Sequence, residues 1–314
     1  MFNITQRIIR TLALAALFTV PLLPLQRATA TFMLGGGEDY AVLFEGVGGN
    51  TLQITNVTCN GNIGVASTGQ ATDSGPSTIN GRIDFAAADT GQFSNNNGSN
   101  VITGGVQYSV AAVQPAMNYI DSLSQALNTE GGASRAISNG TVISTTSGTQ
   151  DVFTYNTQMI HVFNATSFTN GGSQTLTING SATDLVVINL GSLGNIQFHG
   201  GILFTGGINA DNVIFNVGDG NFATHTGGSA LDINNNGGTA GLAQGIFLDP
   251  NGATDVTNAD VFGRVFGGDS HDFQYVSGST ITSPPPVVPD PGATLLLMGL
   301  GLAFLAGAKR KFRS

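Results

Sequence analysis

The chain has 314 residues, a formal net charge of −9 and an apolar content of 41%, which is too high for a disordered protein. Its central part, residues 31–280, contains three arginines, no lysine and eighteen acidic residues. This balance excludes nucleic acid as a partner, because phosphate binding needs a basic patch. The single cysteine, Cys59, cannot form an internal disulfide and is interpreted as a small, buried strand residue.

The first 30 residues have the three parts of a secretory signal peptide. Arg7 and Arg10 form a basic start, and an apolar stretch follows over residues 12–25. Ala28 and Ala30 then supply the small residues that a signal peptidase requires. We therefore predict cleavage after Ala30 and export of the remaining chain, with an uncleaved anchor as the alternative.

Short β-patterned runs fill residues 31–280. Val, Ile, Phe and Thr alternate with polar residues, and glycine- and asparagine-rich pairs bound the runs. The predicted strands are 51–55, 80–85, 175–178, 184–189, 195–198, 202–204, 212–217 and 260–266. Such short strands with tight corners favour a β-solenoid, in which each rung stacks on another. A β-sandwich fits the same pattern and is the alternative.

One segment of the body has helical spacing. The positions that share one face are Val113, Ala116, Met117, Ile120, Leu123, Ser124 and Leu127. Pro115 suits the first turn, and two glycines after residue 130 end the helix. We predict one amphipathic helix over about residues 113–128, with its apolar stripe packed along a sheet face.

The densest polar group lies near the end of the body. It comprises Asp249, Asp255, Asp260, Arg264, Asp269, His271 and Asp272. Paired carboxylates could serve an exported polysaccharide lyase or hydrolase, with Arg264 stabilising a developing anion. Proximity in sequence does not establish catalytic spacing, so we interpret the group as polar corners between strands. A calcium-binding corner is a further alternative, although residues 249–255 lack the full EF-hand pattern.

The histidines of the body give no metal-binding spacing. Three of them stand far apart in the sequence, at His161, His199 and His225. The sequence contains no nucleophile elbow, phosphate-binding loop or zinc-protease motif. We therefore predict no catalytic residue, no metal site and no cofactor.

The C-terminal end has three parts. A proline-rich linker over residues 281–291 precedes an apolar helix over 292–308 and a basic end over 309–314. A helix over 293–308 spans roughly 24 Å, slightly less than a ~30 Å hydrocarbon core, and the basic residues after it can snorkel. The predicted stop-transfer residues, which the positive-inside rule places in the cytoplasm, are Lys309, Arg310, Lys311 and Arg313. We expect residues 279–291 to be extended and poorly packed.

This order of linker, short helix and basic end resembles the PEP-CTERM sorting signal of Gram-negative bacteria, also described as an ice-binding-protein C-terminal domain. The matching motif is Pro289, Asp290 and Pro291, where Asp290 replaces the usual glutamate. The resemblance implies that an exosortase-type membrane protease removes the tail after transient anchoring in the inner membrane. A plain single-pass anchor is the alternative.

Several body segments carry a second resemblance, at residues 80–85, 175–180, 200–207, 211–216, 245–249 and 261–268. They look like the choice-of-anchor A group of bacterial surface proteins and, more distantly, ice-binding-like β-solenoids, which also set one long helix beside the solenoid. Ice binding in those solenoids needs a flat array of Thr, Ser or Asn. This sequence shows only scattered pairs, such as Thr175 and Thr177, without repetition from rung to rung.

The sequence therefore predicts a mainly β protein with one solenoid-like domain over residues 31–280 and a helix alongside it. The N-terminal signal peptide and the C-terminal transmembrane helix flank that domain. We expect a non-enzymatic, exported protein of the cell surface or extracellular matrix, structural or adhesive, with exopolysaccharide as a candidate partner. The alternatives are an exported carbohydrate-active β-helix enzyme and an ice-binding protein.

Overall fold

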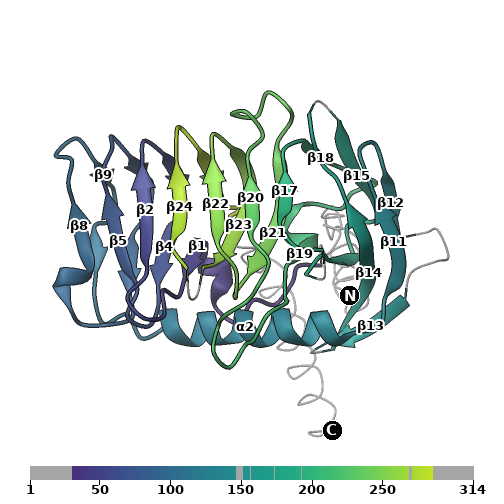
Figure 1. The fold of residues 1–314 in the computed structure, drawn as a ribbon, viewed down its shortest axis with the longest axis horizontal. Helices are drawn as coiled ribbons and strands as arrows, with labels where there is room; N and C mark the ends of the chain where they lie inside the picture. The colour runs from purple at the N-terminus through teal and green to yellow at the C-terminus, as the bar shows by residue number, and fades with distance from the viewer. Residues whose placement is uncertain are drawn as a thin grey trace, which may run out of the picture.

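The computed structural model describes residues 30–145, 151–155, 157–172, 174–191, 193–268 and 271–285. They form a β-solenoid of stacked rungs with one helix, α2 (Val113–Thr129), along its side (Figure 1). Nearly all strand pairs are parallel, as stacked rungs require, so the solenoid prediction is confirmed and the sandwich alternative is wrong. In this part of the chain no helix is long and apolar enough to cross a membrane. The predicted signal peptide, sorting motif and C-terminal helix lie outside the described residues, apart from Ala30.

Each rung contributes strands to three faces. The helix face has the strand order β10 (Val106–Gln107), β7 (Ile83–Phe85), β4 (Asn62–Val65), β1 (Tyr40–Phe44), β23 (Asp260–Gly267), β21 (Ala243–Asp249), β19 (Val213–Asn216), β16 (Leu185–Asn189), β14 (Gln158–Phe168) and β11 (Ala133–Ile137), and β13 (Asp151–Tyr155) pairs with β14. The second face has the order β17 (Ile196–Phe198), β20 (Leu231–Ile233), β22 (Thr254–Thr257), β24 (Phe273–Val276), β2 (Thr51–Thr55), β5 (Gln70–Asp73) and β8 (Phe93–Asn95).

The third face combines two groups of strands with the first residues of β21 and β23. One group is β12 (Val142–Ser144), β15 (Thr175–Asn179) and β18 (Gly201–Thr205). The other is β25 (Thr280–Thr282), β3 (Thr58–Asn60), β6 (Thr78–Ile79) and β9 (Val101–Ile102). The backbone N–H of Ile202 donates to Leu242 O at 2.9 Å, which joins β18 to the start of β21. Three short 3₁₀ helices, η1 (Gly37–Asp39), η2 (Thr90–Gln92) and η3 (Ala210–Asn212), lie in the connections.

The rungs do not stack in sequence order. The chain starts inside the solenoid with β1, β2 and β3, adds rungs towards one end as far as β10, and crosses to the other end through α2 (Figure 1). From β11 it winds back until β23, β24 and β25 pair with β1, β2 and β3. The 17 residues of α2 span about 25 Å, or about five rungs at ~4.8 Å each.

Two apolar layers hold the fold together. One fills the interior, where the rings of Phe215 and Phe247 stack and Phe198 packs edge-on against both, with centroids 5.0–5.2 Å apart. The other lies between α2 and the outer side of the helix face, so strands such as β1 and β16 are buried on both sides. The buried residues of α2 are the seven that the helical spacing predicted, which confirms both the helix and its packing. Cys59 is fully buried in β3, as predicted, and burial raises its pKa to about 12.

A pair of glycines turns two strands from the third face onto the helix face. Gly245 and Gly263 are in register on β21 and β23, and their φ values of 132° and 154° suit only glycine. A Cβ on Gly263 would lie 1.8 Å from the carbonyl oxygen of Gly245. The two backbones therefore approach each other at a distance that no side chain permits.

The start of the predicted linker belongs to the body. Residues 280–282 form β25, which lies between β23 and β3, and Ser279 is fully buried. The carbonyl of Pro284 is also buried against the solenoid, where it accepts a hydrogen bond from Arg264 Nη2 at 3.1 Å. The expectation of poor packing from residue 279 is therefore wrong as far as Pro284, although the chain there is extended. The predicted strand over 80–85 also begins too early, because β7 starts at Ile83.

Candidate binding faces

The third face carries hydroxyl and amide side chains in columns, and we call it the threonine face. Thr280, Thr58 and Thr78 are in register on the adjacent strands β25, β3 and β6. In the next column, Asn80 Nδ2 donates to Asn60 Oδ1 at 2.8 Å, and Asn60 Nδ2 donates to Thr282 Oγ1 at 2.9 Å. These contacts repeat from rung to rung, so the expectation of scattered threonine pairs is wrong for this part of the face.

Exposed apolar side chains share the threonine face. Eight large hydrophobic residues are exposed in the described chain, and five of them point outward here or border the face: Val101, Val142, Leu203, Leu242 and Phe262. Leu203 and Phe262 are 48% and 36% exposed. Val101 continues the threonine column after Thr78, and Phe262 is in register with Thr282, so the polar columns of this face also include apolar groups.

The second face is more acidic, and we call it the acidic face. Its central outward column is formed by residues in register on adjacent strands: Gln197, Asp232, Asp255, Gln274, Gln53, Thr72 and Ser94. Burial raises the pKa of Asp255, and the charge of the neighbouring Asp232 raises it further. Asp232 also pairs with His199, whose Nε2 lies 2.8 Å from Asp232 Oδ2.

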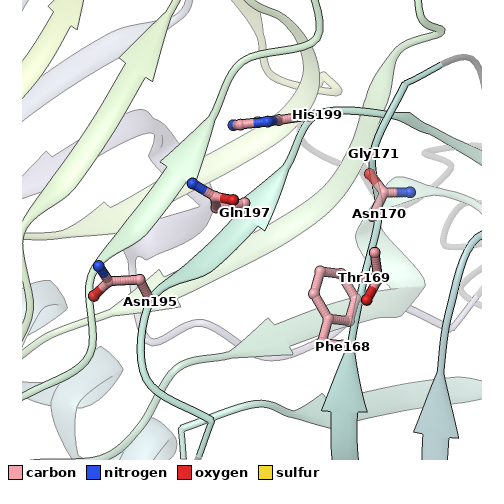
Figure 2. A pocket seen from close by; sticks show the side chains of 7 residues that line it. All are labelled: Phe168, Thr169, Asn170, Gly171, Asn195, Gln197 and His199. Carbon is pink, nitrogen blue, oxygen red and sulfur yellow. The ribbon is translucent and has the colours of Figure 1, made fainter.

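A small pocket lies where the acidic face meets the end of β14. Figure 2 shows Asn195, Gln197 and His199 on one side of it and the segment from Phe168 to Gly171 on the other. Its volume of about 210 Å³ is below the range of about 300–1,000 Å³ that is typical of small-molecule sites. The pocket is therefore smaller than a typical small-molecule site.

The polar residues that stand close together in the sequence, from Asp249 to Asp272, do not come together in the fold. Arg264 is 2% exposed and pairs with Asp211 on the outer side of the helix face, where it also donates to the carbonyls of Glu38 and Pro284. Burial raises the pKa of Asp211, while the charge of Arg264 opposes that rise. The arginine is therefore held inside the fold, away from the outward carboxylates of Asp232 and Asp255 that it was suggested to assist.

The other members of this group lie at separate corners and faces. Asp249 is fully buried, accepts hydrogen bonds from Gly252 N at 3.1 Å and Thr254 Oγ1 at 3.2 Å, and has a pKa that burial raises well above its usual value. Asp260 is half-buried on the threonine face. Asp272 Oδ1 accepts a hydrogen bond from Thr51 N at 2.8 Å. These contacts support the interpretation as polar corners, and Asp269 lies outside the described residues.

The histidines that stand far apart in the sequence, His161, His199 and His225, also lie in different parts of the fold. His161 is in β14, and His199 follows β17. His225 lies in the connection between β19 and β20, and its Nδ1 is 3.8 Å from Glu45 Oε2. Sequence spacing gave no sign of this contact, because 180 residues separate the two partners.

No protein-family model and no curated protein matches the sequence. Solved structures with a similar fold include the ice-binding protein LeIBP from an Arctic yeast, with 15% identity and a TM-score of 0.52 over 83% of this chain and 97% of that one. An ice-binding protein from an Antarctic bacterium of the Flavobacteriaceae has 14% identity and a TM-score of 0.50, and the match covers 83% of this chain and 49% of that one. At such low identity, these similarities establish the solenoid fold alone.

Proposed function

We propose that this chain is an exported, non-catalytic binding protein that contacts an extended surface through its threonine face, as a structural or adhesive component of the cell surface or exopolysaccharide matrix. The observation that carries the proposal is the alignment of Thr280, Thr58 and Thr78 on adjacent rungs. Neighbouring rungs are about 4.8 Å apart, so the face presents equivalent polar groups at a regular interval. A ligand with repeated hydroxyl groups, such as a polysaccharide, can engage many of these groups at once.

The mixture of polar and apolar side chains on the threonine face supports binding along its length. The exposed side chains of Leu203 and Phe262 are in register with Thr177 and Thr282, so polar and apolar contacts can form together. Each contact is weak, but several contacts along one chain reinforce each other because the second and later contacts are intramolecular. The proposal therefore expects weak binding to short oligosaccharides and stronger binding to polymers.

The proposal can be tested with a purified body, residues 30–285, on arrays of exopolysaccharides. A Thr58→Tyr/Thr280→Tyr variant places two bulky rings on the threonine face, and we expect it to bind the polymer at least about tenfold more weakly. The matched control is Gln53→Tyr/Gln274→Tyr, because Gln53 and Gln274 are the outward pair of the adjacent strands β2 and β24 on the acidic face. Equal binding by the wild type and the threonine-face variant would contradict the proposal.

An enzymatic function is not favoured. Catalysis on an acidic sugar would need paired carboxylates and a nearby cation. The carboxylates of Asp232 and Asp255 face outward, whereas Arg264 is buried in its ion pair with Asp211. His199 Nε2 lies at hydrogen-bond distance from Asp232 Oδ2, so this aspartate already has a partner on the acidic face.

Sorting through the C-terminal tail is part of the same proposal. The export and surface location rest on the resemblance of Pro289, Asp290 and Pro291 to a PEP-CTERM motif, and an exosortase-type protease is the expected partner. In a host with a matching exosortase, Asp290→Ala should leave an unprocessed, membrane-retained form that is heavier by about the mass of the tail. Blots of membrane and external fractions measure this difference. If wild type and variant have the same mass in the same fraction, a plain membrane anchor replaces the sorting hypothesis.

Ice binding is the second candidate function, and the rung-to-rung threonine column is the observation that favours it. The charged Asp260 lies in the same column as Thr280, however, and interrupts the regular array. If ice is the ligand, the body should slow ice recrystallisation, and Thr58→Tyr/Thr280→Tyr should remove that effect while Gln53→Tyr/Gln274→Tyr retains it. Unchanged ice growth in the presence of wild type would eliminate this candidate and leave the matrix role intact.

A further inference from the structure

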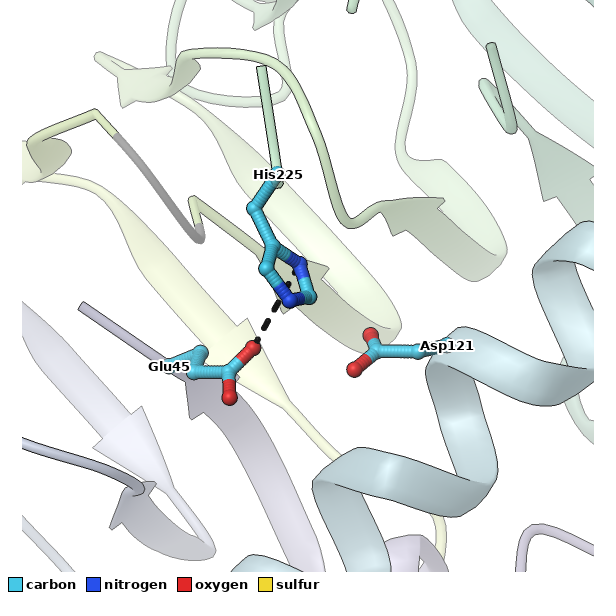
Figure 3. A group of neighbouring side chains, drawn as sticks. All are labelled: Glu45, Asp121 and His225. Atoms are coloured by element: carbon cyan, nitrogen blue, oxygen red, sulfur yellow. Dashed lines mark ion pairs between the residues drawn. The ribbon is translucent and has the colours of Figure 1, made fainter. Parts of the chain in front are cut away.

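Three residues that are far apart in the sequence meet beside the middle of α2. Glu45 follows directly after β1, Asp121 lies within α2, and His225 lies in the connection between β19 and β20. Figure 3 shows the three side chains pointing into one space from these three elements. One ligand atom from each lies within 4.8 Å of the other two.

The carboxylate of Glu45 is the central observation. Its side chain is 8% exposed, and its Oε2 accepts no hydrogen bond from the described residues. His225 Nδ1 lies 3.8 Å from this oxygen, which is too far for a hydrogen bond. Two ligands of one tetrahedral Zn²⁺ ion, each about 2.1 Å from the metal, are roughly 3.4 Å apart. The observed separation of 3.8 Å is close to this value, so a small movement of the two side chains would let both atoms share one ion.

The other oxygen of Glu45 is held in place. Gln114 Nε2 donates to Glu45 Oε1 at 3.2 Å, and the backbone N–H of Ser67 donates to Gln114 Oε1 at 2.6 Å. This chain of hydrogen bonds orients the carboxylate so that Oε2 faces Asp121 and His225. Such supporting contacts are typical of carboxylates that ligate metals.

Among the described residues, no arginine pairs with Glu45, whose one ion-pair contact is with His225 Nδ1. Within residues 31–280 the only basic residues besides histidine are three arginines. Arg82 pairs with Asp84, Arg264 pairs with Asp211, and Arg135 donates to Val142 O. A positive ion beside Glu45 would therefore compensate for the burial of its carboxylate.

We propose that Glu45, Asp121 and His225 bind one divalent transition-metal ion of the Zn²⁺ type. An imidazole nitrogen together with carboxylate oxygens favours such an ion over Ca²⁺ and Mg²⁺, which prefer oxygen ligands alone. The ion would connect the end of β1, the helix and the β19–β20 connection. Three protein ligands leave the fourth tetrahedral position to water, and the site does not depend on the ligand of the threonine face.

The test uses the full-length chain in mild detergent, stripped of metal with EDTA. Titration with ZnCl₂ should show one site per chain and raise the thermal midpoint, whereas CaCl₂ and MgCl₂ at the same concentrations should not. Co²⁺ in place of Zn²⁺ should give visible absorption bands characteristic of mixed nitrogen and oxygen ligands. The isosteric variant Glu45→Gln and the variant His225→Ala should each weaken Zn²⁺ binding at least tenfold, and Gln114→Ala should weaken it by about tenfold.

The matched control is His199→Ala, which removes a histidine paired with an aspartate on the acidic face. This variant should bind Zn²⁺ as the wild type does. Circular dichroism of the stripped variants verifies that they are folded, so loss of binding is not loss of structure. Absence of Zn²⁺ binding by wild type, or unchanged binding by the Glu45→Gln/His225→Ala double variant, would overturn the proposal.

Discussion

Gly263→Ala is expected to destabilise the solenoid by at least about 3 kcal/mol, enough to prevent folding of a marginally stable body. The added Cβ would lie 1.8 Å from the carbonyl oxygen of Gly245, and both groups belong to backbones held by sheet hydrogen bonds. Because neither backbone can move without breaking the pairing of β21 with β23, the clash has no inexpensive relief. The φ of 154° adds a strain that L-residues rarely tolerate.

Urea unfolding monitored by circular dichroism measures this effect. Gly98→Ala is the matched control, because a Cβ at Gly98 would meet no atom within 4 Å and its φ is not in the left-handed region. We expect that control to change the free energy of unfolding by less than about 0.5 kcal/mol. A Gly263→Ala protein that unfolds at the wild-type urea concentration would show that the close approach of the two strands is not required.

Arg264→Leu is expected to cost about 3–5 kcal/mol of unfolding free energy. The substitution leaves Asp211 partly buried without its ion partner and removes hydrogen bonds to the carbonyls of Glu38 and Pro284. The substitution therefore removes contacts from three segments at once: the segment before β1, the connection at η3 and the segment after β25.

A double-mutant cycle separates the ion pair from the other contacts. Arg264→Leu/Asp211→Leu should be less destabilising than the sum of the two single changes, because no unpaired charge then stays behind. Arg135→Leu is the control, since its hydrogen bond to Val142 O is solvent-exposed, and we expect it to cost less than about 1 kcal/mol. Additive single changes would mean that the buried pair contributes little.

The local elements were predictable from the sequence because their signals are local. The spacing of Val113, Ile120 and Leu127 fixed the buried side of α2, and the alternation in residues 51–55 matched β2 to the residue. The end of the body was misplaced because the prolines from Pro284 onward suggested a linker. Residues 280–282 have weak strand signals of their own and acquire structure by pairing with β23 and β3 on both sides.

The candidate binding residues were less predictable because they depend on the order of the rungs. Thr280 and Thr58 are 222 residues apart, yet they are neighbours because β25 returns to the first rung. No periodicity within a window of sequence can reveal that contact. Glu45, Asp121 and His225 were missed for the same reason, since each stands alone in its own segment.

The return of β25 to the first rung has a consequence for how the molecule is made. Until β23, β24 and β25 arrive, β1, β2 and β3 each have one sheet edge without its native partner. A polypeptide synthesised from its N-terminus therefore cannot complete its first rung until almost the whole body has emerged. Contacts of such long sequence separation also form slowly, because loop closure precedes the gain from pairing. We therefore expect the topology itself to delay folding until β25 has been made.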